Sequence, residues 1–508
     1  MEALKMSNDT KSDISSGATT PTSGIGTLPA ELLSPIFVLT APDEGTHCTP
    51  AQKYEMPWGL KSVSKHWRAV SESTPALWNR IHVIMDDCES YSSYCLARAG
   101  SLIPHGTPVW LSICAYSCPV STKAIQTLVL PNLTRLQGLR LSIPIDAFIA
   151  SSLPNVQLPQ LRELHLDLRS PVVKNFIDFR YSDTRLFIGI LRSAVNLRHI
   201  SLFSNKREIR MVLFEALLAP GSLCAQLTHA NIKKLWDVEL ADIEALLEPC
   251  PNIEVFYADV EPNCRRQIKG SSLPLARLRE LSLISTQIPP ETVNLRIPWP
   301  QLNVLRLGYL RGSGFFIALL RQCHAVETLS GNIWHCTSEP CDDAAVEPDI
   351  YLPCLESFKI CTIYPCGYED LTALVAPRLL SLDINCASRS FPFEYISDLL
   401  TRSACTLRRI RLNIFARAYE MVELQNVLAG MPSVETFVSN LVLDEDTLDL
   451  IARGVLLPQV TEIEFHCATP QVFDSFVERR IESERGVVAV PLRIAVGRNK
   501  NFTKEWMA

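Results

Sequence analysis

Cysteine and histidine residues are the first candidates for chemistry in this sequence, because thiolate and imidazole groups bind transition metals. They come close together along the chain at five places: His47-Cys48, Cys114 with Cys118, Cys224 with His229, His335-Cys336 and Cys361 with Cys366. None of these places contains a paired Cys-x-x-Cys motif or four ligands in a recognisable order. We therefore expect buried or loop thiols rather than a structural metal site, and no cofactor.

Catalytic motifs are equally scarce. Gly312-Ser313-Gly314 and Gly24-Ile25-Gly26 lack the strand-turn-helix context and the lysine of a phosphate-binding loop. We find no serine nucleophile elbow and no glutamate-flanked metal helix in the sequence. The chain is therefore expected not to be an enzyme, and an enzymatic function would need an acid, base or metal set that converges only in the fold.

Four basic residues could together bind a carboxylate or a phosphate through charge-assisted hydrogen bonds. They are Arg306, Lys359, Arg409 and Arg411, and they lie near one another in a repeating motif. Asp383 lies among them and would partly neutralise such a site. A substrate-binding cluster and an ordinary solvated polar surface both remain open at this stage.

The motif that positions these residues is Leu-x-x-Leu-x-Leu. Clear copies begin at Leu136, Leu161, Leu197, Leu278, Leu302, Leu379 and Leu407, and weaker copies begin at Leu227, Ile253, Val326, Leu355, Val434 and Val460. The thirteen starting positions extend from residue 136 to residue 460, which is 324 residues for twelve intervals, or 27 per repeat. This period falls within the roughly 20–29 residues of a leucine-rich repeat.

Each repeat is expected to contain one strand and one helix. The second and third apolar residues of the motif are two apart, the period of a strand with one buried face. Helical spacing precedes several motifs, as in Ile188-Leu191, Ile243-Leu246-Leu247, Ile317-Leu320 and Leu424-Val427-Leu428. Such units bury their apolar faces only by stacking, which predicts an α/β solenoid with a curved parallel sheet inside and helices outside. Val109–Ile113 is expected to add an early strand, and Val488–Val496 a terminal one.

The residue between the second and third apolar positions should face the concave surface, because alternate strand residues point to opposite faces. These residues form a predicted row: Arg140, His165, Ser201, Tyr257, Ser282, Arg306, Ser330, Lys359, Asp383, Arg411, Val438 and Glu464.

Composition limits the classes of partner. The 508 residues carry a net charge of −6, which gives no electrostatic reason to expect nucleic acid or an anionic membrane. No apolar stretch approaches the roughly 18 residues of a membrane span. The 17 cysteines, several at apolar positions such as Cys250, Cys323 and Cys405, are typical of reduced thiols in a cytoplasmic or nuclear protein. Residues 1–27, rich in Ser, Thr, Asp and Gly, are expected to be a disordered tail.

A different pattern precedes the repeats. Leu28-Pro29-Ala30-Glu31-Leu32-Leu33-Ser34-Pro35-Ile36-Phe37 is followed by Val63-Ser64-Lys65-His66-Trp67-Arg68 and then by Thr74-Pro75-Ala76-Leu77-Trp78. Apolar residues recur in the first two segments at helical spacing, and Thr74-Pro75 reads as the start of a third helix with Leu77, Trp78 and Ile81 buried. A small three-helix domain is therefore predicted for residues 28–84, with an insertion at 41–57, followed by the repeat array at 85–508.

This pattern resembles the F-box, the adaptor-binding module of SCF-type cullin–RING ubiquitin ligases, in the form found in fungal F-box proteins. The resemblance implies that the chain is a substrate receptor, which binds a Skp-type adaptor through the F-box and an unknown target protein through the repeats. Ubiquitin transfer would then belong to other subunits. The alternative is a non-ligase, protein-binding scaffold with a degenerate F-box.

Two departures from the F-box pattern bear on this choice. Pro35 lies where a long first helix needs an interior N–H group, so that helix is either kinked or restarted with Ser34 as its cap. The 41–57 insertion lengthens the connection between the first two helices. We assign adaptor binding to Leu28, Pro29, Leu32, Ile36, Phe37, Leu60 and Val63, and the core of the module to Trp67 and Trp78.

Overall fold

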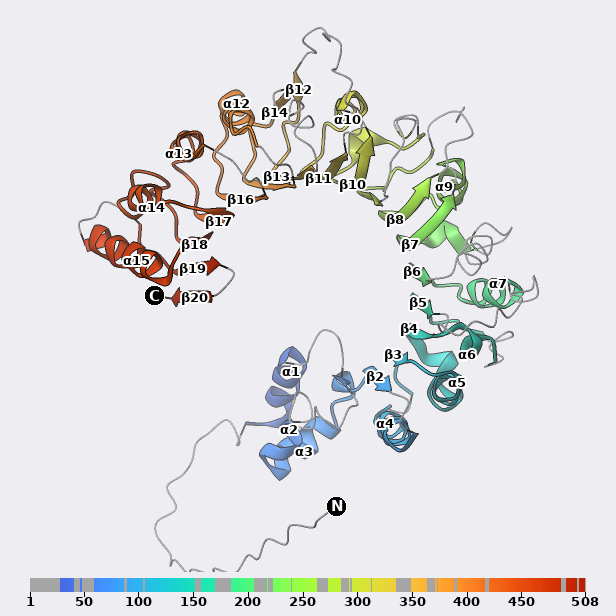
Figure 1. Cartoon of the computed structure of the whole chain (residues 1–508). Coiled ribbons are helices and arrows are strands. Elements are labelled where there is room, and N and C mark those ends of the chain that lie inside the picture. The colour runs from blue at the N-terminus through green and yellow to red at the C-terminus, as the bar shows by residue number, and fades with distance from the viewer. Residues whose placement is uncertain are drawn as a thin grey trace, which may run out of the picture.

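A computed structural model shows an open arc whose inner edge is a sheet (Figure 1). It describes residues 28–40, 46–47, 59–85, 89–103, 106–150, 157–169, 184–204, 217, 223–238, 240–262, 273–284, 292, 295–311, 313–334, 349–362, 371, 373–387, 391–415, 420–485, 490–499 and 502–507. The predicted disordered tail and most of the 41–57 insertion lie outside these residues.

Each repeat contributes one strand to the inner sheet. Within the described residues this sheet has eighteen strands, and a separate two-stranded sheet joins β12 and β14. In the large sheet each strand pairs in parallel with the next along the chain, except that β20 runs antiparallel to β19. The predicted curved parallel sheet is therefore confirmed.

The strands are β1 Thr46–His47, β2 Arg80–Met85, β3 Val109–Ala115, β4 Leu136–Pro144, β5 Glu163–Arg169, β6 His199–Ser204, β7 His229–Val238, β8 Val255–Pro262, β9 Glu280–Ile284, β10 Val304–Arg311, β11 Thr328–Trp334, β12 Ile350–Tyr351, β13 Ser357–Thr362, β14 Leu374–Val375, β15 Ser381–Cys386, β16 Arg409–Ile414, β17 Thr436–Val442, β18 Glu462–His466, β19 Ile494–Asn499 and β20 Phe502–Met507. All thirteen predicted motifs lead into a strand of the large sheet.

The helices from α4 onward lie on the outer side of the arc (Figure 1). The α-helices are α1 Ala30–Thr40, α2 Leu60–Val63, α3 Lys65–Glu72, α4 Glu89–Leu102, α5 Cys118–Ala124, α6 Ile145–Ala150, α7 Thr184–Ser193, α9 Leu240–Leu247, α10 Ser313–Leu320, α12 Glu394–Ser403, α13 Met421–Ala429, α14 Glu445–Ala452 and α15 Pro470–Arg485. The other helical turns are η3 Pro75–Leu77, η4 Ile125–Val129, η5 Leu130–Arg135, η6 Leu223–Gln226 and η8 Trp299–Gln301. Within the array, helices occur at all four places where helical spacing before a repeat motif predicts them.

The repeat motif forms a strand because it places apolar side chains on one face and polar side chains on the other. In the repeat of β16, Leu407, Ile410 and Leu412 are buried, whereas Arg409 and Arg411 between them are exposed. The apolar residues of all repeats form one continuous array core from Ile81 to Ala495. Stacking thus buries faces that a single repeat would leave in water.

The array begins earlier than the sequence predicts. Residues 80–85, which we expected to complete the third helix of the N-terminal domain, form β2 and pair with β3. Ile81 and Val83 therefore belong to the array core, and the third helix is reduced to the turn η3. Two residues of the insertion also enter the sheet, because β1 pairs with β2 at Ile81 and His82.

The C-terminal end also differs from prediction. The last parallel strand, β19, begins at Ile494 instead of Val488, and β20 was not predicted. The buried residues of β19 are Ala495 and Gly497, whereas Ile494 and Val496 lie on its other, more exposed face. A Cβ atom at Gly497 would meet the ring of Phe473 on α15. The apolar alternation of Val488–Val496 is therefore one residue out of phase with the buried face of β19, which is why it misplaces this strand.

Helix α1 continues through Pro35. Ser34 does not start a second helix there, and its hydroxyl oxygen lies 3.0 Å from the hydroxyl oxygen of Thr74 instead. This contact joins α1 to the segment after α3. Of the two alternatives drawn from the sequence, a restart of the helix at Ser34 is therefore wrong.

Candidate functional site

Residues 28–40 and 59–78 form a small helical module with a core of its own. Its buried residues, the helical core, are Leu33, Phe37, Leu60, Val70, Leu77 and Trp78. Leu28, Trp67 and Leu102 pack against this core while partly buried. Because Leu102 belongs to α4 and also packs against the array core, it connects the module to the solenoid.

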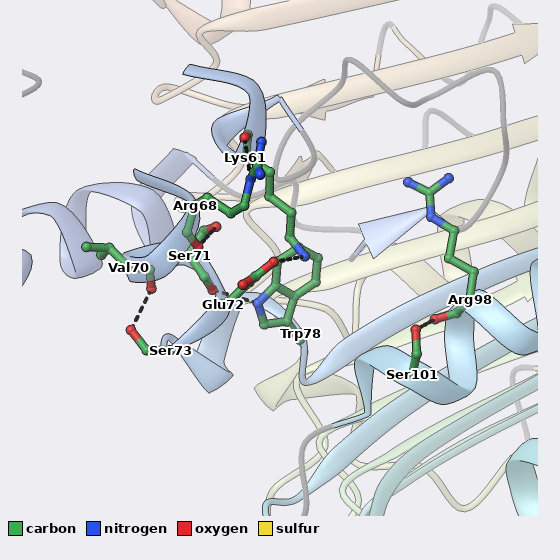
Figure 2. Close-up of polar contacts among 9 residues, drawn as sticks. All are labelled: Lys61, Arg68, Val70, Ser71, Glu72, Ser73, Trp78, Arg98 and Ser101. Atoms are coloured by element: carbon green, nitrogen blue, oxygen red, sulfur yellow. Dashed lines mark hydrogen bonds and ion pairs between the residues drawn. The ribbon is translucent and has the colours of Figure 1, made fainter. Parts of the chain in front are cut away.

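Trp78 holds the helices of the module together (Figure 2). Its indole N–H donates to the backbone carbonyl of Ser71 over 2.7 Å. The Lys61 ammonium lies 4.8 Å from the ring centroid and also pairs with Glu72 over 3.1 Å. Trp78 thus combines apolar burial, a hydrogen bond and a cation–π contact, so it stabilises the packing of α2 and α3.

Trp67 lies at the rim of the same core. Its side chain is half-buried, and its ring centroid is 4.9 Å from that of Phe37. Its indole nitrogen is buried and has no hydrogen-bond partner within the described residues. We therefore expect Trp67 to contribute less to the stability of the module than Trp78.

The outer side of the module carries exposed apolar side chains. Leu32, Ile36 and Leu39 are 54%, 37% and 85% exposed, and their spacing places them on one face of α1. Val38 on α1 and Val63 on α2 are exposed as well. We call these five residues the outer apolar face. Several exposed apolar residues on one small module are typical of a protein interface.

The seven residues assigned to adaptor binding from sequence separate into two groups. Leu32, Ile36 and Val63 belong to the outer apolar face, Pro29 is exposed, and Leu28 is half-buried. Phe37 and Leu60 are 1% and 3% exposed in the helical core, which removes them from any surface available to a partner. Sequence periodicity could not separate the two groups, because α1 has two adjacent apolar stripes.

The predicted row of concave residues is found in the sheet. Strand pairing places Arg140 opposite His165, His165 opposite Ser201, and so on through Glu464. The row has one further member, Asn231, between Ser201 and Tyr257. Sequence analysis missed Asn231 because its repeat has Ala230 where a large apolar residue is usual.

The four predicted basic residues do not form an uncompensated patch. Arg306 pairs with Glu280 over 3.5 Å, and Lys359 pairs with Asp383 over 3.4 Å. Asp383 lies directly between Lys359 and Arg411 in the row. Two of the four cations are thus paired with carboxylates inside the sheet, which weakens the case for an anion-binding site there.

Two connected pockets lie on the concave side at the other end of the array. The first, about 510 Å³, covers β2–β5, and the second, about 400 Å³, covers β4–β7. Both are lined by Arg140, His165 and Asp167. We call the two together the N-terminal groove. Their lining includes four cations and two carboxylates, a net charge of +2 with histidines neutral: Arg80, Arg140, Arg169, Lys233, Glu163 and Asp167.

The Trp110 side chain is part of the lining of this groove. Arg80 and Trp110 are opposite each other in β2 and β3, and the Arg80 guanidinium lies 5.3 Å from the ring centroid. On the other side Trp110 is opposite Gly138, and a Cβ atom at Gly138 would overlap the indole ring. Glycine at position 138 therefore allows the indole to lie across β4.

We expect Gly138→Ala to destabilise the array by about 1–3 kcal/mol, because the added methyl group must displace Trp110. Gly100→Ala in α4 is the matched control. There the nearest atom to the new Cβ is 3.9 Å away, so alanine should stabilise the helix by about 0.5–1 kcal/mol. Urea unfolding of both variants measures the difference. An unchanged midpoint for Gly138→Ala would contradict the packing of Trp110 described above.

Histidines are concentrated along the same strands. Burial lowers the pKa of His165, and Arg140 and His199 lower it further, while Glu163 opposes them. Burial also lowers the pKa of His199, whose ring centroid is 4.2 Å from that of His229. Both imidazoles are therefore neutral at pH 7 and gain charge only on acidification.

Most of this groove was missed from sequence, which placed only Arg140, His165 and Ser201 of its lining in the concave row. Trp110, Glu163, His199 and His229 occupy the residue before the second apolar position of their repeats, which also faces the concave side. Comparing that position between repeats would have revealed the aromatic and histidine residues. This position predicts concave residues because both it and the position two residues later point to the same face of the sheet.

Other chemistry is limited in the part of the chain that the structure describes. No group of three or more metal-ligating side chains occurs among these residues. The described cysteines are free thiols, and burial raises the pKa of Cys323 to about 12. None of the described helices has the length and apolar character needed to cross a membrane.

One parallel strand per repeat, outer helices where they occur and a continuous apolar core define an α/β solenoid of the leucine-rich-repeat kind. No protein-family model and no curated protein matches the chain.

Solved structures give weak similarities. The yeast Rad7–Elc1 complex aligns at 15% identity over 82% of this chain and 88% of the other, with a TM-score of 0.36. The leucine-rich repeat-containing protein LegL7 of Legionella pneumophila aligns at 12% identity over 79% and 98% of the two chains, with a TM-score of 0.27. A Bacteroides fragilis protein aligns at 13% identity over 61% and 75%, with a TM-score of 0.31. At these TM-scores the fold assignment rests on strand order and register alone.

Proposed function

We propose that this chain is a substrate receptor of an SCF-type cullin–RING ubiquitin ligase. In this proposal the helical module binds a Skp-type adaptor, and the solenoid binds the target protein. The observation that carries it is the outer apolar face, which projects from α1 and α2 of a module with its own core. The F-box-like order of residues in the same segment supplies the identity of the partner.

In this proposal we assign adaptor binding to the exposed residues of the module. The outer apolar face, Leu32, Ile36, Val38, Leu39 and Val63, takes the place of the seven residues named from sequence, together with the exposed Pro29. Phe37 and Leu60 support this face from inside the helical core. Removing residues 28–83 would be a poor test, because it would delete most of β2 and expose the edge of the sheet.

A better test is the double substitution Leu32→Asp and Ile36→Asp in the full chain. Burial of one such side chain contributes about 1.5–3 kcal/mol, so loss of two should weaken adaptor capture at least about 100-fold. Co-purification with a recombinant Skp-type adaptor measures this. Val422→Asp is the control, since Val422 is 63% exposed on α13 of the array.

Circular dichroism of the double variant separates interface loss from unfolding. Undiminished capture by a folded double variant would refute the assignment of the outer apolar face. If the unaltered chain captures no adaptor at all, the alternative is favoured, a protein-binding scaffold whose F-box-like segment serves only stability.

A further inference from the structure

The N-terminal groove contains unpaired hydrogen-bonding atoms of both kinds. The Trp110 indole nitrogen, a donor, is buried without a partner in the described protein. Two acceptors are in the same condition, Asp167 Oδ1 and Asn231 Oδ1. Buried polar atoms are usually paired, and a small rotation of these side chains would bring the three atoms to the groove, where a ligand can supply the partners.

Only one of the two carboxylate oxygens of Asp167 is unpaired. Its other oxygen, Oδ2, accepts from Ser142 over 2.8 Å and from Arg169 over 3.0 and 2.7 Å. These bonds occupy Oδ2 and leave Oδ1 as the acceptor that remains. A ligand with only anionic oxygens could satisfy the donor of Trp110 but neither acceptor. A peptide backbone offers both N–H and C=O groups at regular spacing.

The charge in the groove favours an acidic ligand. Arg140 is exposed on the concave side and forms no ion pair or hydrogen bond with any residue that the structure describes. It differs in this from Arg306 and Lys359, which are paired with carboxylates. The groove as a whole carries +2 within a chain of net charge −6. An anionic side chain near Arg140 would gain a charge-assisted hydrogen bond.

The dimensions fit a short extended segment. Six strands, β2–β7, cross the groove, and neighbouring strands lie about 4.8 Å apart, so it is about 24 Å long. An extended chain rises about 3.3 Å per residue, which gives room for about seven residues.

We propose that the N-terminal groove binds an extended acidic peptide, with an anionic side chain of the peptide on Arg140 and its backbone on Trp110, Asp167 and Asn231. This deepens the target-binding part of the proposed function and rests on it. Carboxylates and phosphates share the required chemistry, and the experiment distinguishes them.

Acid should strengthen this binding. His165 faces Arg140 on β4, Glu163, Asp167 and Arg169 on its own strand, and His199 on β6. The pKa of free His165 lies below its usual 6.5, and a bound anion would raise it. At a pH between the pKa of His165 in the free protein and its pKa in the complex, the complex therefore binds more protons than the free protein does. Affinity for the peptide should rise several-fold from pH 7.5 to pH 5.5 as a result. Glutamate side chains of the peptide stay charged over this range.

The test selects ligands for the full chain, without adaptor, from a random library of eight-residue peptides. Enrichment of Asp and Glu is expected. Fluorescence anisotropy of the best peptide should show at least tenfold weaker binding to Arg140→Gln. Arg411→Gln is the matched control, since Arg411 is exposed in the same row at the other end of the sheet, and it should change affinity less than twofold. Synthetic versions with phosphoserine or Gln in place of Glu identify the anionic group.

Several results would overturn the proposal. They are selection without acidic enrichment, equal binding of the Gln peptide, and equal losses for Arg140→Gln and Arg411→Gln. A preference for phosphoserine over Glu supports it and assigns the anion as phosphate. Because no adaptor is present, acidic-peptide binding together with failed adaptor capture would retain the groove and reject the ligase role.

Discussion

Arg480→Ala is expected to destabilise the C-terminal end of the solenoid by about 3–5 kcal/mol, the usual cost of removing one partner from a buried charged network. The Arg480 side chain is fully buried. Its guanidinium donates to the carbonyls of Ile451, Val460 and Val490 over 2.9, 3.0 and 2.7 Å. Glu484 lies 4.0 Å from its Nε. Alanine would leave three carbonyls without this donor, two of them in buried contacts and one in a partly buried contact.

Hydrogen exchange of residues 490–507 is the appropriate measurement, since solenoids open locally instead of in one step. Arg479→Ala is the control. Arg479 precedes Arg480 on α15, but its side chain is 45% exposed and pairs with Asp449 at the surface. Its loss should cost less than about 1 kcal/mol. Equal effects of the two substitutions would show that Arg480 does not hold the terminal strands together.

The second large effect is expected for Trp78→Ala, at about 3–5 kcal/mol for a buried aromatic side chain. The substitution removes the hydrogen bond to Ser71 and the contact with Lys61 as well as apolar burial. The helical module is small and has little stability to spare, so α1 and α3 should unfold locally. Proteolysis and hydrogen exchange within residues 28–78 would detect this.

Trp67→Ala provides the comparison for Trp78→Ala. Trp67 is half-buried and its indole nitrogen has no partner among the described residues, so its loss should cost about 1–2 kcal/mol. The two variants should therefore differ clearly in protection of α1. A cost for Trp67→Ala as large as that for Trp78→Ala would place Trp67 at the centre of the helical core.

Local patterns predicted most of the solenoid. The spacing of Leu407, Ile410 and Leu412 fixes both a strand and its buried face, and the same holds for every copy of the motif. β2 was missed because Pro75 and Trp78 suggested a helix, although Ile81 and Val83 alternate as in a strand. β20 was missed because its antiparallel pairing with β19 depends on a reversal of the chain and not on the repeat.

The surfaces were harder to predict than the fold. Phe37 and Ile36 are adjacent apolar residues on α1, and only the position of α3 decides which of them is buried. In the sheet, the sequence placed Arg306 and Lys359 in the correct row, and it placed Asp383 among them. It could not show that Glu280, from the neighbouring strand, reaches Arg306. Pairing across strands depends on register, which one motif does not contain.

The direct passage from the helical module into the sheet has a mechanical consequence. Asn79 alone separates Trp78 from β2, and its carbonyl accepts a hydrogen bond from the backbone N–H of Trp110 over 2.7 Å. Leu102 packs against both cores across the same junction. The helical module and the sheet are therefore joined directly at this point, without a flexible linker. If the module binds an adaptor, the curvature of the arc sets the reach and orientation of a captured protein, and lengthening a linker could not adjust them.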